Sequence, residues 1–181
     1  MPKFFYVNGY GATLDEEDGN YRRYLTAVRE TIRTAAPDGY FVLILAGGYT
    51  NLDCISEAQT MAKWMRRFGF EDNLVLIEDT GSLEENLTAA AKITAGKPVT
   101  VFCEKSRRHH TAFLAKRHLG HHVSVVPVDF DEKSGRLRHR LVTTFVRFPL
   151  VFLAYHSEKF AKLNRWLRRL HVKSARAKNQ T

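Results

Sequence analysis

Five short apolar runs, separated by longer stretches with helical periodicity, constrain the fold of this chain more than any other feature of its sequence. The runs are rich in Val, Ile, Leu and Phe, and they cover residues 4–7, 40–45, 74–77, 99–103 and 123–128. Near-continuous apolar strands that alternate with helices are typical of a parallel sheet covered on both faces. We therefore predict a three-layer, Rossmann-like α/β domain with a mainly parallel sheet of about five strands flanked by helices.

The stretches between these runs have apolar residues at the spacing of one helix face. We predict helices over residues 21–34, 56–68, 82–94 and 107–119. Ser56 is a candidate N-cap, and Ser82 opens a Ser-Leu-Glu-Glu capping box that ends at Glu85. Glycine follows three of the helices, at positions 69, 96 and 120, where it favours the left-handed conformation that ends a helix.

After residue 128 the pattern changes. Residues 136–148 fit a strand or a helix, and Pro149 starts or kinks a helix. Residues 152–172 have an apolar stripe opposite a basic face, which predicts a basic amphipathic helix. Such a helix either packs on a core with its basic face outward or lies on a membrane surface. We predict one domain over residues 1–172, made of a core over 4–128 and a helical extension over 139–172, followed by a basic flexible tail over 173–181.

Charge is distributed unevenly along the chain. Residues 1–104 contain 10 Lys and Arg against 15 Asp and Glu, whereas residues 105–181 contain 18 against 4 and carry a net charge of +14. A basic C-terminal part indicates an anionic partner, such as phosphate, nucleic acid or an acidic membrane surface. The alternative is a solvated basic face that only keeps the protein in solution.

The cysteines, the N-terminus and the lengths of the apolar segments indicate the cellular compartment of the protein. Cys54 and Cys103 lie far apart without metal-ligand spacing, so we expect neither a disulfide framework nor a metal site, and a reducing compartment fits best. The N-terminus lacks the layout of a signal peptide, and no apolar run approaches the roughly 18 residues of a transmembrane helix. We expect a cytoplasmic protein, with a peripheral position at the membrane as the alternative.

Polar or glycine-rich residues follow the predicted strands, at the edge where open parallel sheets bind ligands. Glycine lets a ligand approach the backbone, and helix N-termini at Ser56 and Ser82 would offer amides to an anion. The alternative is ordinary turns with ordinary caps. The candidate ligand-binding residues are Asn8, Gly9 and Gly11 after the first strand, Gly47, Gly48, Ser56 and Glu57 after the second, Glu78, Thr80, Ser82, Glu85 and Asn86 after the third, and Glu104, Ser106, Arg107, Arg108 and His109 after the fourth.

This edge combines carboxylates with cations. Arg107 and Arg108 are suited to grip a phosphate or carboxylate, while the carboxylates suit a ribose hydroxyl or general-base chemistry. The candidate catalytic residues are Glu78, Glu85 and His109. Two alternatives stay open. In one, Glu57 and Glu85 pair with these arginines and only brace the loops. The other concerns Cys103, which is a nucleophile or, more often for a strand-end cysteine, a packing residue. Neither a dinucleotide-binding fingerprint nor a P-loop is complete in this sequence.

The order and spacing of these pieces resemble the YdcF/SanA/ElyC-like family (domain of unknown function 218) from about residue 4 to residue 128. The most specific pieces are Ser56-Glu57-Ala58 and a box that starts at Glu78 and ends at Glu85-Asn86. In that box, Thr80 stands where the family has Ser, Ser82 where it has Asn, and Leu83 where it has Thr. After the fourth strand, Arg107 falls where the family has His, and His110 falls where it has Arg.

The resemblance implies a Rossmann-like fold with a polar pocket for a nucleotide-like small molecule, with S-adenosylmethionine as one candidate, and a link to the bacterial envelope. It implies no settled reaction. We therefore expect a domain that binds a nucleotide-like or phosphorylated small molecule at the carboxyl edge of its sheet. The alternatives are a peripheral membrane protein that uses residues 152–173, and nucleic-acid binding through the basic C-terminal part, which no recognised motif supports.

Overall fold

The computed structural model describes residues 2–9, 19–49, 55–80, 82–128, 145–146, 148–157 and 160. The chain forms two compact units, Met1–Lys133 and Ser134–Thr181. The predicted single domain over residues 1–172 extends over both units and stays a prediction. Gly11, residues 136–144 and the predicted tail lie outside the described residues.

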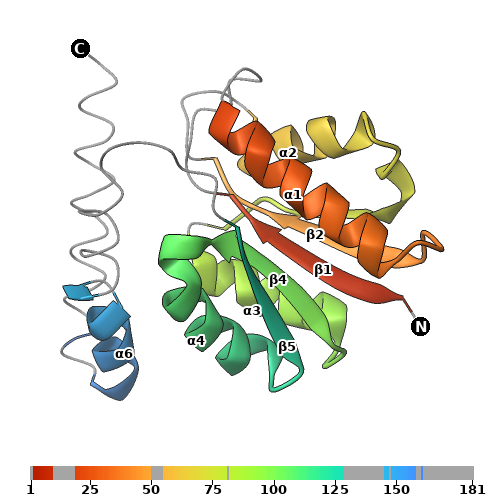
Figure 1. The fold of residues 1–181 in the computed structure, drawn as a ribbon. Coiled ribbons are helices and arrows are strands. Elements are labelled where there is room, and N and C mark those ends of the chain that lie inside the picture. Colours follow the sequence, from red (N-terminus) through yellow and green to blue (C-terminus); the bar gives the residue numbers. More distant parts are fainter. Residues whose placement is uncertain are drawn as a thin grey trace, which may run out of the picture. The chain divides into compact units, whose positions relative to one another are not determined.

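The first unit contains one five-stranded, all-parallel sheet (Figure 1). Its strands are β1 (Lys3–Asn8), β2 (Phe41–Ala46), β3 (Leu74–Ile77), β4 (Val99–Glu104) and β5 (Val123–Val128), in the order β3-β2-β1-β4-β5. This order confirms the predicted Rossmann-like fold, because successive strands add to one side of β1 and then to the other. The reversal places a topological switch point between β1 and β4.

Helices cover both faces of the sheet, as predicted (Figure 1). One face carries α1 (Gly19–Ala35) and α2 (Glu57–Arg66), and the other carries α3 (Leu83–Thr94) and α4 (Arg108–Leu119). Short 3-10 turns, η1 (Glu71–Asn73) and η2 (Lys105–Arg107), precede β3 and α4. The predicted helices are confirmed, with α1 starting two residues early and α2 ending at Arg66 instead of residue 68.

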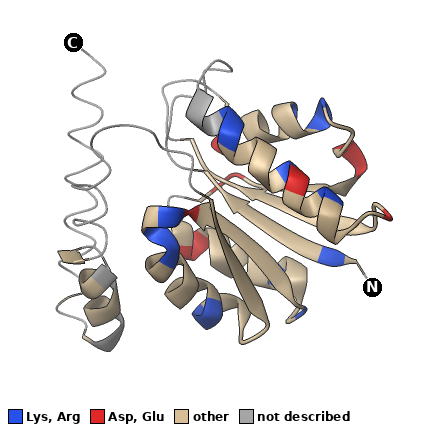
Figure 2. Cartoon of the chain, viewed as in Figure 1, with Lys and Arg blue, Asp and Glu red and all other residues tan. Residues whose placement is uncertain are grey.

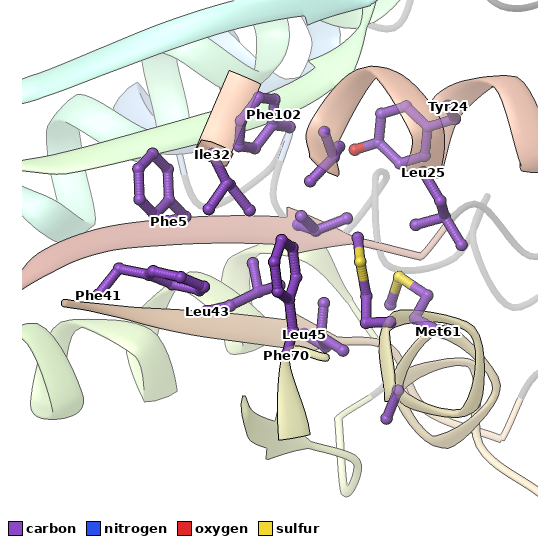
Figure 3. Packing of buried hydrophobic residues seen from close by; sticks show 14 of the residues in the cluster. Phe5, Tyr24, Leu25, Ile32, Phe41, Leu43, Leu45, Met61, Phe70 and Phe102 are labelled. Atoms are coloured by element: carbon purple, nitrogen blue, oxygen red, sulfur yellow. The ribbon is translucent and has the colours of Figure 1, made fainter. Parts of the chain in front are cut away.

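The main core lies between the sheet and the α1–α2 layer (Figure 3). Phe5 and Val7 point to this layer from alternate positions of β1, where Tyr24, Leu25 and Ile32 of α1 are fully buried. Aromatic rings extend the cluster toward the end of α2: the centroids of Phe41 and Phe70 are 5.2 Å apart in an edge-to-face pair. The helical spacing of the buried α1 residues confirms the predicted amphipathic face.

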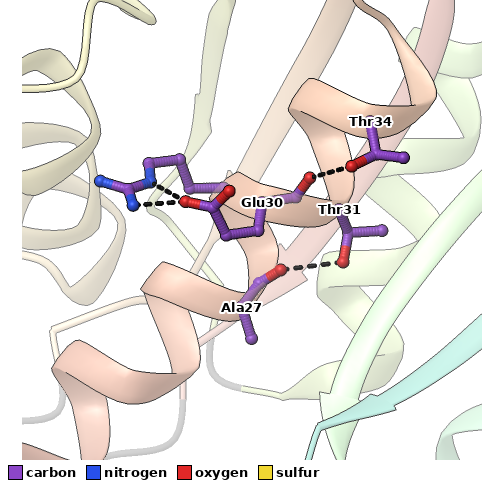
Figure 4. A network of polar contacts seen from close by, with 5 residues as sticks. Ala27, Glu30, Thr31 and Thr34 are labelled. Carbon is purple, nitrogen blue, oxygen red and sulfur yellow. Dashed lines mark hydrogen bonds and ion pairs between the residues drawn. The ribbon is translucent and has the colours of Figure 1, made fainter.

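Threonine hydroxyl groups on α1 donate hydrogen bonds to carbonyls of the same helix (Figure 4). The hydroxyl groups of Thr31 and Thr34 donate to the carbonyls of Ala27 and Glu30, at 2.8 and 3.0 Å. Threonine satisfies its hydroxyl in this way on a helix surface. Arg29 pairs with the neighbouring Glu30 and also lies over the ring of Phe68, 4.4 Å from its centroid, which links α1 to the turn after α2.

Caps set the helix ends close to the predicted positions. Ser56 accepts from the Gln59 amide at 3.0 Å, and Ser82 from the Glu85 amide at 3.2 Å. Glycines 69 and 120 have φ values of +79° and +89°. After α3, however, the chain turns left-handed one residue before the predicted glycine: Ala95 has φ +48°, and Gly96 follows with φ +77°.

In the second unit, the described residues contain α6 (Phe148–His156). Pro149 lies in its first turn, where a missing amide is tolerated, as the sequence predicted. The helix begins four residues before the predicted start at residue 152, and most of the predicted amphipathic helix lies outside the described residues. None of the described helices combines the length and the apolar character needed to cross a bilayer.

Candidate functional site

Polar side chains gather where the strands of the first unit end. Asn8 is the last residue of β1, Glu78 and Thr80 follow β3, and Glu104 is the last residue of β4. Because every strand is parallel, these ends share one edge of the sheet. Rossmann-like folds bind ligands at this edge, beside the point where the strand order reverses.

A chain of hydrogen bonds joins β1 to α3 across this edge. The Asn8 side-chain oxygen accepts from the Tyr6 hydroxyl at 3.0 Å and from the Asn86 amide at 2.7 Å. Asn86, in turn, accepts from the hydroxyl of Thr80. Tyr6 is fully buried and Asn86 is almost so, and buried amides fix loop geometry when their bonds are satisfied. The chain therefore holds Asn8 in one orientation at the end of β1.

Glu57 is a buried carboxylate in the first turn of α2, with 4% of its surface exposed. Its side chain fills the space beside two glycines: a Cβ atom on Gly9 would lie 1.8 Å from Glu57 Oε2, and one on Gly47 would lie 2.7 Å from Glu57 Cβ. Gly48 has a similar restriction, because its Cβ would lie 2.2 Å from the Thr80 carbonyl oxygen. The missing side chains of these glycines therefore leave space for Glu57 and for the backbone at Thr80, whereas the sequence predicted that they leave space for a ligand.

The first backbone amides of α2 are already hydrogen-bonded within the protein. The Ser56 hydroxyl donates to Glu78 Oε1 at 2.5 Å while it caps the Gln59 amide. The Glu57 and Ala58 amides donate to the carbonyls of Gly48 and Gly47, at 3.2 and 3.1 Å. This helix end does not offer an anion the open amides that the sequence predicted, because the β2–α2 loop folds back onto them.

The N-terminus of α3 is acidic. Ser82 caps the helix, and the first turn carries Glu84 and Glu85. Carboxylates at this position stabilise the helix dipole and repel a bound anion. Glu85, a candidate catalytic residue, lies exposed on this turn. The expected anion contact at Ser82 is therefore disfavoured by its own neighbours.

The turn between β4 and α4 has the opposite charge (Figure 2). Arg108 starts α4, whose first turn contains no acidic residue, and η2 contributes Lys105 and Arg107 immediately before it. Arg108 is exposed, as are Lys105 and His109. Cationic side chains beside the positive end of a helix form a favourable environment for an anion.

Glu104 braces this basic turn from inside. Its carboxylate accepts from the Ser106 hydroxyl at 2.5 Å and pairs with Arg107 Nε at 3.4 Å. The side chains of Glu104 and Arg107 are 12% and 29% exposed. A bracing ion pair is therefore present here, but Glu104 makes it, whereas the sequence suggested Glu57 and Glu85 as the partners of these arginines. Lys105, Arg108 and His109 are the more accessible members of the turn.

Cys103 packs on the α4 side of β4 and is 2% exposed. Burial raises the pKa of its thiol to about 11, and a hydrogen bond with Thr111 opposes this shift only in part. The thiol is therefore protonated near neutral pH, which makes it a poor nucleophile. Of the two interpretations left open by the sequence, the structure favours packing.

Two groups of predicted residues thus come together. The edge cluster contains Asn8, Ser56, Glu57, Glu78, Thr80 and Asn86 with the glycines around them, and the basic turn contains Glu104, Ser106, Arg107, Arg108 and His109. Sequence reasoning missed Tyr6, which it treated only as strand core. The two-residue spacing of Tyr6 and Asn8 was the available signal, since it puts both side chains on one face.

Among the described residues, no group of three or more His, Cys, Asp or Glu is arranged to hold a metal.

Comparison with known proteins gives no match, whether to family models, to curated proteins or to solved structures. The resemblance to the YdcF/SanA/ElyC-like family therefore stays a prediction.

Proposed function

We propose that the first unit binds a small molecule with an anionic group, of the nucleotide-like or phosphorylated class, between the ends of β1 and β4. One observation carries the proposal: the basic turn lies beside the switch point and combines cations with the start of a helix that has no acidic first turn. β1 and β4 are paired neighbours, with Val7 opposite Phe102, so Asn8 and the basic turn border the same edge. Among the other helix starts at this edge, that of α2 is closed, that of α3 is acidic, and that of α1 follows four consecutive acidic residues in the sequence (15–18), so the start of α4 is the favoured anion position.

The edge cluster suits the uncharged part of such a ligand. Carboxylates at the strand ends of Rossmann-like folds bind ribose hydroxyls, and Glu78, which directly follows β3, has the chemistry and location for that role, whereas Glu57 is buried. Nucleotides, sugar phosphates and S-adenosylmethionine all combine hydroxyl groups with an anionic group. The proposal covers binding by these classes and assigns no reaction to Glu78, Glu85 or His109.

The test is a thermal-shift panel of these three classes of compound against the full chain. A ligand present at about one hundred times its Kd should raise Tm by roughly 5–10 °C, from the linkage between binding and stability. Arg108→Gln removes one charge-assisted contact and should weaken binding about tenfold or more. Lys116→Gln is the matched control, because it removes one exposed positive charge from the last turn of the same helix.

Two results would contradict the proposal. One is a panel in which no compound changes Tm. The other is a ligand that stabilises Arg108→Gln and Lys116→Gln to the same extent as the wild type, since the bound anion would then lie away from the start of α4.

A further inference from the structure

The second unit concentrates the positive charge of the chain. Residues 134–181 contain 12 Lys and Arg against a single acidic residue, Glu158, so their net charge is +11, whereas residues 1–133 carry a net charge of −2. The protein's overall charge of +9 thus arises entirely from its last 48 residues. A charge of this density requires an anionic partner or full solvation.

The same unit exposes large apolar side chains. In α6, every residue from Phe148 to Tyr155 is apolar or aromatic, and Phe152 and Leu153 are 43% and 39% exposed. Just before the helix, Phe145 and Val146 are 70% and 49% exposed. Large apolar side chains that remain exposed within one short segment of sequence indicate an interaction surface.

The length of α6 decides how it can meet a membrane. Nine residues form a helix of roughly 14 Å, about half of the roughly 30 Å hydrocarbon core of a bilayer. A helix of this length cannot cross, but it can lie in the interface with its apolar side chains among the acyl chains. Stable attachment by such a short segment needs a second signal, and a basic segment of the same chain supplies one.

We propose that residues 145–178 dock the protein on an anionic lipid surface, with Phe152 and Leu153 of α6 inserted and the basic residues that follow α6 bound to headgroups. Nucleic acid would use the positive charge but gives no role to exposed aliphatic side chains such as Val146 and Leu153. A second copy of the chain would bring two segments of charge +11 together, and their repulsion opposes such a dimer. An anionic lipid surface matches both features at once.

The test is co-sedimentation of the full chain with vesicles of two compositions: phosphatidylcholine alone, and phosphatidylcholine with an equal part of phosphatidylglycerol. Binding should require phosphatidylglycerol and should weaken as salt is raised. Phe152→Ser/Leu153→Ser should weaken binding by roughly tenfold or more, from the apolar burial that is lost. Replacing Arg165, Arg168 and Arg169 by Gln should weaken it by about fivefold for each charge near the surface.

Tyr40→Ser is the matched control, because Tyr40 is 58% exposed in the first unit and should not affect vesicle binding. A duplex oligonucleotide and sedimentation velocity in free solution complete the experiment. The proposal is overturned if neither vesicle binds the wild type, or if Phe152→Ser/Leu153→Ser binds as the wild type does. It is also overturned if the oligonucleotide displaces the vesicles in competition, or if the wild type is a dimer that this double substitution dissociates. None of these outcomes depends on the ligand proposed for the first unit.

Discussion

At the scale of single residues, the closest packing in the site is between Gly9 and Glu57. A methyl group on Gly9 would lie 1.8 Å from the Glu57 carboxylate, so Gly9→Ala must displace that buried side chain. We expect Gly9→Ala to lower the free energy of unfolding by about 1–3 kcal/mol, the usual cost of overpacking. Urea denaturation measures this change.

A double-mutant cycle with Glu57→Ala identifies the cause. Glu57→Ala removes the carboxylate that would lie 1.8 Å from the methyl group at position 9 but keeps a Cβ atom 2.9 Å from it, so the clash is relieved in part and the two substitutions should couple by about 0.5–3 kcal/mol. Simple additivity of the two effects would show that Glu57 is not the neighbour that requires glycine at this position.

A substitution at Ala95 should instead raise the free energy of unfolding. It adopts φ +48° at the end of α3, a conformation that costs a residue with a Cβ atom about 1–2 kcal/mol. Glycine avoids that cost but loses more chain entropy on folding, so Ala95→Gly should stabilise the protein by about 0.5–1 kcal/mol. Ala89→Gly, inside the same helix, should instead destabilise it by about 1 kcal/mol. Equal losses for both variants in thermal melts would contradict the left-handed assignment of Ala95.

At the scale of elements, we expect His118 to make the contact between α3 and α4 sensitive to pH. Its Nδ1 lies 3.2 Å from the Thr88 hydroxyl, and its Nε2 lies 3.9 Å from Glu84 Oε1. Burial lowers the pKa of His118 below its usual 6.5, Glu84 opposes this shift and Arg117 adds to it. The folded protein therefore disfavours the charged imidazole relative to the unfolded chain.

The sign of the pH dependence follows from linkage. A lowered pKa in the folded state leaves the stability contribution of His118 intact above pH 6.5, and that contribution is lost as pH falls through the folded-state value. The free energy of unfolding should thus decrease from about pH 7.5 to about pH 5, and His118→Asn should make that part of the curve flatter. A curve with the same slope in wild type and variant, measured by urea denaturation, would assign the decrease to other groups.

The helices and strands also show which features of the structure could be predicted from the sequence. Strands and helices were predictable because their periodicities are local, and Ser56 and Ser82 act as the caps that their positions indicated. The closed N-terminus of α2 was not predictable, since it depends on how the Gly47-Gly48 loop folds back onto the first amides. The packing of Glu57 against Gly9 joins residues 48 positions apart and likewise depends on the three-dimensional fold. Local pattern thus predicted the elements and the polar edge of the sheet, whereas tertiary packing closed the N-terminus of α2.

At the scale of the whole molecule, the two units divide structure and charge between them. All residues of the described hydrophobic core lie between Phe4 and Val128, and so do both the edge cluster and the basic turn. The second unit adds a net charge of +11 and the exposed side chains of α6. Folding and ligand binding are therefore expected to depend on the first unit, and vesicle binding on the second.

A chain that ends at residue 133 tests this division. It should fold cooperatively, because the five paired strands and all core residues in the described part of the chain lie before residue 129. It should also bind any ligand that stabilises the full chain with about the same Kd, and it should lose sedimentation with anionic vesicles. Circular dichroism melts and the thermal-shift panel measure the first two outcomes. A truncated chain that melts without cooperativity would mean that residues 134–181 complete the core, and the division of roles would then be wrong, because one folding unit would carry both the site and the membrane contact.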